Sequence, residues 1–103
     1  MRDRLIVPAY VEAQIDACIA YIVQTLRNPD AARNVLDELA KTYERLSCLP
    51  EAAPLCRDAY LRAKNYRIIT LPHHHYLLIY RMEERIGYVV GFFHMRGNYW
   101  DKL

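Results

Sequence analysis

The apolar residues of this chain change their spacing once, near the middle, and that change restricts the fold more than any other feature. Before Pro50 they recur every three or four residues, which is the period of an amphipathic helix. After Pro54 they form short runs rich in Ile, Val, Tyr and Phe, which are typical of β-strands. The sequence therefore predicts helices in the first half and a sheet in the second.

Two helices are predicted in the first half, joined by a tight turn. The stripe of the first helix comprises Val11, Ile15, Cys18, Ile19, Ile22 and Leu26. The stripe of the second comprises Ala32, Val35, Leu36, Leu39, Tyr43 and Leu46. Between them, Asn28 is a good helix cap and Pro29 a good first helical residue, so we expect an antiparallel helix hairpin. A short strand, "RLIV" (residues 4–7), precedes the hairpin and ends at Pro8, which cannot donate to a sheet.

Three strands are predicted after the helices. They are "NYRIITL" (residues 65–71), "HYLLIYRM" (75–82) and "GYVVGFF" (87–93). The links between them, "PHH" and "EERI", have lengths that suit hairpins, so the strands should form an antiparallel meander. With the helices on one face of this sheet, the fold class is α+β with two layers. We expect one domain over residues 1–103, because a chain of this length rarely divides.

Charge is distributed unevenly along the chain, although the net charge is only +2. Residues 1–57 carry seven Lys/Arg against eight Asp/Glu, whereas residues 58–103 carry seven against four and hold all four histidines. The second half should therefore present a basic face that could approach phosphate. The amino terminus has too few consecutive apolar residues for a signal peptide or membrane span, so we expect a cytoplasmic protein. Three cysteines without a CxxC pair indicate reduced, mostly buried thiols.

The last predicted strand leads directly into polar and aromatic residues, in the stretch "FFHMRGNYWDKL". His can act as an acid or a base near neutral pH, Arg can hold an anion bidentately, and Tyr can stack on an unpaired base. The candidate catalytic residues of these types are His94, Arg96, Tyr99, Arg67 and His75. The candidate nucleic-acid or target-binding residues are Arg67, Arg81, His73, His74 and Lys102.

Each of these residue types also has a structural interpretation. The strand tyrosines, Tyr66, Tyr76, Tyr80 and Tyr88, alternate with aliphatic residues as sheet-packing side chains do. Arg67 could instead pair with an acidic helix residue, and Trp100 could cap the core. The histidine run at 73–75 has no Cys or carboxylate beside it at ligand spacing, so we expect neither a metal nor another cofactor.

The order of strand, helix hairpin and meander resembles the RelE/ParE superfamily, the toxins of bacterial type II toxin–antitoxin modules, often labelled plasmid stabilisation proteins. The resemblance rests on "NPDAARNVLDEL", "YERLSCLPEAAPLC", "NYRIITL", "YLLIYRM" and "VVGFFHMRGNY", which together span most of the chain. The helical segments are most similar to the ParE branch, whose members poison DNA gyrase, and "FHMRGNY" is similar to the His-x-x-Arg-Asp ending of that branch. The resemblance implies a toxin that a cognate antitoxin neutralises, with gyrase slightly favoured as its target.

Two other interpretations of the same resemblance stay open. RelE-branch toxins cleave messenger RNA on the ribosome, and Arg67, Arg96 and Tyr99 fall near positions that this branch uses, but Ile69 and Leu77 replace its Lys and Arg. A YafQ-like branch cuts RNA with histidines, one of them just after the last strand, where His94 lies. If the protein is an enzyme, it is a metal-independent endoribonuclease. A third reading is a relative that has lost toxicity and serves as a binding or regulatory protein.

Overall fold

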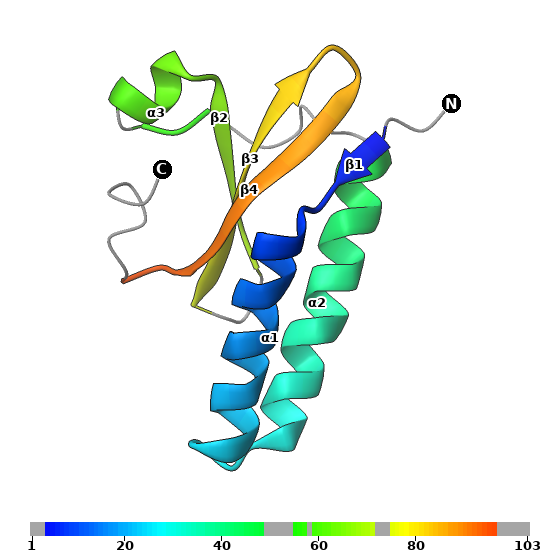
Figure 1. Ribbon diagram of the computed structural model, residues 1–103, viewed down its shortest axis with the longest axis vertical. Helices are drawn as coiled ribbons and strands as arrows, with labels where there is room; N and C mark the ends of the chain where they lie inside the picture. Colours follow the sequence, from blue (N-terminus) through cyan, green and yellow to red (C-terminus); the bar gives the residue numbers. More distant parts are fainter. Residues whose placement is uncertain (1–3, 49–54, 58, 72–74, 97–103) are drawn as a thin grey trace.

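The computed structural model describes residues 4–48, 55–57, 59–71 and 75–96 (Figure 1). The elements are β1 (Arg4–Ile6), α1 (Ala9–Gln24), α2 (Pro29–Cys48), α3 (Ala59–Ala63), β2 (Tyr66–Thr70), β3 (Tyr76–Glu83) and β4 (Ile86–His94). The predicted strand, helix hairpin and three-stranded meander are all present, so the α+β class is confirmed. α3 is an addition that the sequence analysis did not predict.

The sheet has the strand order β1-β4-β3-β2. β2, β3 and β4 pair antiparallel, as predicted for a meander, while β1 pairs parallel with β4. β1 is short and its register covers only residues 86–88 of β4, which continues to His94. The carboxyl-terminal half of β4 therefore extends past the end of β1.

Local sequence chemistry fixes where the two long helices begin. The Pro8 carbonyl accepts the N–H groups of Val11 and Glu12 at 3.0 and 3.1 Å, so Pro8 caps α1 through its backbone. Asn28 Oδ1 accepts the Ala31 N–H at 3.1 Å, which confirms the predicted cap of α2. Arg27, in the turn before it, has a left-handed backbone with φ 52°.

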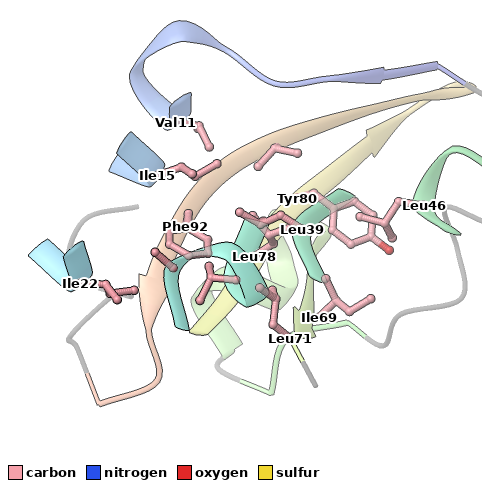
Figure 2. Close-up of a cluster of buried hydrophobic side chains, with 13 residues drawn as sticks. Val11, Ile15, Ile22, Leu39, Leu46, Ile69, Leu71, Leu78, Tyr80 and Phe92 are labelled. Atoms are coloured by element: carbon pink, nitrogen blue, oxygen red, sulfur yellow. The ribbon is translucent and has the colours of Figure 1, made fainter. Parts of the chain in front are cut away.

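The main core lies between the helix hairpin and one face of the sheet (Figure 2). Its buried side chains include Val11 and Ile15 from α1, with Val35, Leu39 and Leu46 from α2. The sheet contributes Ile69, Leu78, Tyr80, Val89 and Phe92. Each fully buried side chain of this size stabilises the fold by about 1.5–3 kcal/mol, so this layer contributes most of the hydrophobic stabilisation.

A second cluster lies on the opposite face of the sheet. Leu77 and Ile79 of β3 are buried there against Cys56 and Leu61, the latter on α3. Figure 1 shows α3 beside β2, away from the helix hairpin. The sheet is thus covered on both faces near β2, where we expected a cover on one face alone.

α1 also secures the part of β4 that β1 does not reach. The Tyr10 hydroxyl donates to the Val90 carbonyl at 3.2 Å, and the Phe92 N–H donates to Gln14 Oε1 at 3.0 Å. Between these contacts the register shifts, since Ile79 pairs with Gly91 while Tyr80 pairs with Val89, leaving Val90 as the extra residue of a bulge. These bonds satisfy strand-edge groups that would otherwise lack partners, and they hold the end of β4 in place.

Candidate functional site at the end of the sheet

Two predicted histidines meet at the end of the sheet where β4 finishes. His94, the last residue of β4, pairs in register with Tyr76, the first residue of β3, and His75 comes directly before it. The His75 and His94 rings have centroids 6.1 Å apart with their planes tilted by 37°. Both residues are exposed, so this end of the sheet presents two imidazoles to solvent.

The Tyr76 ring packs against the rings of both Phe92 and His94. Its ring stacks on Phe92, with centroids 5.3 Å apart and planes 14° apart, and meets His94 edge-on at 5.4 Å and 86°. Burial raises the pKa of Tyr76 to about 12, and a hydrogen bond with the Cys18 thiol acts in the same direction. Tyr76 is therefore neutral at physiological pH and links α1 to the site through Cys18, a packing role like the one predicted for the strand tyrosines.

The residues after His94 turn back toward its ring. The Met95 N–H donates to the His75 carbonyl at 2.7 Å, which continues the β3–β4 pairing by one step. The Arg96 N–H donates to Nδ1 of His94 at 3.1 Å. An accepting Nδ1 carries no proton, so the proton of His94 is on Nε2, and this ring offers an N–H donor to a partner.

The structure does not bring Arg67 to these histidines. Arg67 lies on β2 opposite Tyr80, which is four residues, or ~13 Å along the strand, from Tyr76. Arg81 is one residue further and pairs with Tyr66 and Tyr88. The sequence predicted that one sheet face would carry His75, Arg67, His94, Arg96 and Tyr99. The structure brings His75, His94 and Arg96 together at one end of the sheet and places Arg67 further along the strands, while Tyr99 lies outside the described residues.

Several sequence candidates lie outside the described residues. These are His73, His74, Tyr99 and Lys102, together with Trp100. Within the described part, no group of three His, Cys, Asp or Glu side chains gathers as metal ligands would. No helix of that part is long and apolar enough to cross a membrane. All three cysteines are free, as expected, but Cys48 is exposed, so the thiols are less uniformly buried than predicted.

Two α1 residues that hold this end of the sheet were not among the predicted site residues. Tyr10 and Gln14 lie four residues apart, so they share one face of α1 beside β4. Two polar side chains four residues apart, next to the apolar stripe, indicate a second contact face on this helix. The sequence does not show which strand that face will contact. Cys18, counted in the apolar stripe, also bonds Tyr76.

A four-stranded sheet, a helix hairpin on one face and a strand end that carries two histidines define a small two-layer α+β protein. The model of the ParE toxin of type II toxin–antitoxin systems, parDE, matches residues 5–99. The chain therefore belongs to the ParE toxin family, and the resemblance seen in the sequence is confirmed.

A solved structure and the curated proteins give the remaining comparisons. A chain of a chromosomal ParDE TA system from P. aeruginosa matches with a TM-score of 0.72 and 15% identity, covering 89% of this chain and 95% of that one. At this identity the likeness concerns the fold. No curated protein matches.

Proposed function

We propose that this protein is the toxin of a type II toxin–antitoxin pair, that it acts in the cytoplasm on DNA gyrase, and that a cognate antitoxin holds it inactive. The observation that carries this proposal is the family match over residues 5–99, which includes the helix hairpin as well as the sheet. The similar structure comes from a system in which such a toxin occurs with its partner. One domain, spanning the chain, performs both interactions.

The geometry at the sheet end supports a binding role better than acid–base catalysis. A general acid needs the imidazolium form, but protonation at Nδ1 would break the bond that His94 accepts from Arg96. A general base would use an unprotonated Nε2, which the same bond disfavours. Arg67, the cation predicted to hold a scissile phosphate, is ~13 Å away along the strand. His94 is thus suited to donate a hydrogen bond to its target.

The target contacts that we assign are His94, His75 and Arg96, with Met95 beside them. Met95 is exposed to 45%, so this surface joins a flexible apolar side chain to an exposed cation and two imidazole rings. Such a combination is common where one protein surface recognises another. The Arg96 N–H holds the His94 ring through Nδ1, and the Met95 N–H holds the backbone of His75 beside it.

Expression of the chain alone in a bacterium, followed by supercoiling assays with purified gyrase, tests the proposal. We expect growth arrest and loss of gyrase supercoiling. Unaffected supercoiling together with cleaved message in a translating extract would refute the gyrase target, and normal growth would favour a non-toxic binding relative.

Two substitutions test the site itself. His94→Ala and Arg96→Ala should each weaken binding of the target by about tenfold, which corresponds to about 1.4 kcal/mol, and should raise the inducer concentration required for growth arrest. Arg33→Ala is the matched control, because Arg33 is a well exposed cation on α2, far from β4 in the sequence and paired only loosely with Asp30 at 3.8 Å. If both site variants arrest growth as the parent does, the assignment is wrong whichever target is right.

RNA cleavage remains a second candidate because two imidazoles lie within 6.1 Å of each other. A base and an acid at this separation could act on either side of one phosphate, provided that His94 releases its bond to Arg96. Incubation of the protein with message in a translating extract, with His75→Ala as the variant, would test it. Cleavage that disappears in His75→Ala would establish the second candidate over the first.

A further inference from the structure

The two long helices present different kinds of surface to solvent. The exposed side chains of α2 are largely charged, as expected for a helix that faces water, and include Asp30, Arg33, Asp37, Lys41, Glu44 and Arg45. The exposed side chains of α1 are mostly apolar, and these are Ala9, Tyr10, Ala13, Ala17, Ala20, Tyr21 and Val23. A helix that is apolar on every side is normally covered on every side, so the exposed surface of α1 indicates a partner.

Part of this exposed surface forms a continuous stripe along the helix. Tyr10, Ala13, Ala17 and Tyr21 follow one another at spacings of three and four residues, so they share one face, and Ala20 adjoins them. We name these five residues the α1 stripe. Its tyrosines are 56% and 54% exposed, and from residue 10 to residue 21 the helix rises by ~16 Å, about three turns. A second helix of that length fits between the tyrosines, because the alanines let its backbone approach closely.

One border of the α1 stripe is acidic. Asp16 lies three residues after Ala13 and four before Ala20, and Glu12 lies four residues before Asp16, so both carboxylates follow the same edge. α1 contains no Lys or Arg, and neither carboxylate forms an ion pair with a described residue. A partner that brings Lys or Arg to this edge would therefore complement its charge.

The α1 stripe adjoins the target contacts at the end of β4. At one end of the stripe, the Tyr10 hydroxyl donates to the Val90 carbonyl of β4 at 3.2 Å. Toward the other end, Cys18 bonds Tyr76, whose ring centroid is 5.4 Å from that of His94. Figure 1 shows α1 beside the carboxyl-terminal half of β4. The α1 stripe and His94 thus lie on adjoining parts of one surface.

The size of the α1 stripe shows that it is part of a larger contact. α1 has 16 residues, so it is ~24 Å long, and a width of ~10 Å gives ~240 Å² on this side, or ~500 Å² for a pair of helices. A specific interface buries at least ~1,000 Å² in total. The stripe is too small to bind a partner alone, which favours a joint surface with the end of β4.

We propose that the α1 stripe binds a basic, amphipathic helical segment of the toxin's target, so that the target-contact surface extends from the end of β4 over α1. This inference rests on the proposed function above and adds a second part to its contact surface. The tyrosines and alanines of the stripe take the apolar side of that segment, and Glu12 and Asp16 pair with its Lys or Arg side chains. His94 and Arg96 contact the same target beside it.

Two other occupants fit the α1 stripe less well. A second copy of the chain would bring its own Glu12 and Asp16 to the same border, where like charges repel and α1 supplies no cation. DNA held by the target would bring phosphates to these carboxylates, which is also repulsive. The acidic border therefore favours a basic protein segment.

Binding of the full chain to purified DNA gyrase tests the proposal. Calorimetry at low and high salt compares the parent with Asp16→Lys and Tyr21→Ala, and Asp37→Lys, at an exposed position of α2, is the control of equal charge change. We expect about tenfold weaker binding for both α1 variants, a smaller salt dependence for Asp16→Lys alone, and affinity within about twofold of the parent for Asp37→Lys. All three positions are exposed, so each variant should fold, and thermal unfolding verifies it.

Three outcomes overturn this inference while the parent still binds gyrase, and they leave the toxin function intact. Unchanged gyrase affinity in both α1 variants removes the stripe from the target surface, and equal weakening by Asp37→Lys reduces the effect to overall charge. A dimer of the parent in sedimentation, dissociated by Tyr21→Ala without loss of gyrase affinity, would make the stripe a contact between copies. Absence of binding by the parent would instead refute the gyrase target itself and this inference with it, a result that the parent alone shows.

Discussion

At the scale of single residues, two tyrosines show how differently one side-chain type can be used. Tyr76 bonds the Cys18 thiol and supports His94, so its hydroxyl has a partner. The Tyr43 hydroxyl is buried and finds no hydrogen-bond partner among the described residues. A buried hydroxyl without a partner loses its bonds to water and gains nothing in exchange, so Tyr43 costs stability where Tyr76 contributes to it.

Tyr43→Phe should therefore leave the free energy of unfolding unchanged or raise it, by up to about 1 kcal/mol. Tyr76→Phe, which removes the bond to Cys18, should lower it by about 1 kcal/mol. Urea unfolding followed by circular dichroism measures both changes. Equal losses in the two variants would mean that the Tyr43 hydroxyl has a partner after all.

The same residues predict a loss of stability at alkaline pH. The pKa values of Tyr43 and Tyr76 rise from the ordinary 10.0 to about 12, in both cases mainly through burial. Because the folded state favours the neutral phenols, their ionisation opposes folding. The free energy of unfolding is therefore unaffected by these two groups below pH 10 and falls as the pH rises through 12. The urea midpoint should fall across this range, and the fall should be smaller in the double variant Tyr43→Phe/Tyr76→Phe. An identical fall in both proteins would assign the effect to other groups.

At the scale of elements, α1 replaces the strand that β4 lacks. β1 ends at Ile6, and beyond it the edge of β4 is bonded to Tyr10 and Gln14 instead of to another strand. The end of β4 that carries His94 is therefore held in place by hydrogen bonds from α1. The stability of the site should then depend on contacts that lie far from it in sequence.

Gln14→Ala tests that dependence. Loss of the Oε1 acceptor leaves the Phe92 N–H without its partner, which should cost about 1 kcal/mol and speed exchange of that amide hydrogen by about fivefold. Gln14→Glu, which keeps an acceptor at the same place, should preserve the protection. The exchange rate of the Phe92 amide hydrogen is measured in both variants. An unchanged rate in Gln14→Ala would show that this hydrogen bond does not hold the edge of β4.

The elements that the sequence predicted are those with a strong local signal. The helix stripes, the Asn28 cap and the three β-rich runs all depend on spacing and residue type within one segment, and all of them are present. α3 has five residues, too few for a periodic stripe, so no local pattern could establish it. The clue to it lay in β3, where Leu77, Leu78, Ile79 and Tyr80 are all buried, because an unbroken apolar run indicates a strand covered on both faces.

Register explains what could be predicted of the candidate site. His75, His94 and Arg96 end up together because each lies at an end of one of two strands joined by a short hairpin. Arg67 was grouped with them by residue type and by its similarity to a strand position of the RelE branch, and its distance from them depends on how β2 aligns with β3. Pairing between strands is a property of the assembled sheet, so the sequence could supply the chemistry of the candidates but not their distances.

At the scale of the whole molecule, the sheet connects two apolar clusters that lie on its opposite faces. β3 contributes Leu78 and Tyr80 to the cluster under the helix hairpin, and Leu77 and Ile79 to the cluster under α3. Alternate residues of one strand thus belong to both. Neither cluster can separate from the sheet without exposing side chains of a strand that the other cluster needs, which implies that the two unfold together.

Leu61→Ala tests this cooperativity and, with it, the expectation of one domain. The leucine is 1% exposed, so its truncation should lower the free energy of unfolding by about 2–5 kcal/mol. If the clusters are coupled, urea unfolding stays a single transition whose midpoint falls while its slope is unchanged. Arg62→Ala, an exposed neighbour on α3, should stay within about 0.5 kcal/mol of the parent. A separate early transition in Leu61→Ala would mean that the α3 side melts alone, and the expectation of one cooperative domain would then be wrong.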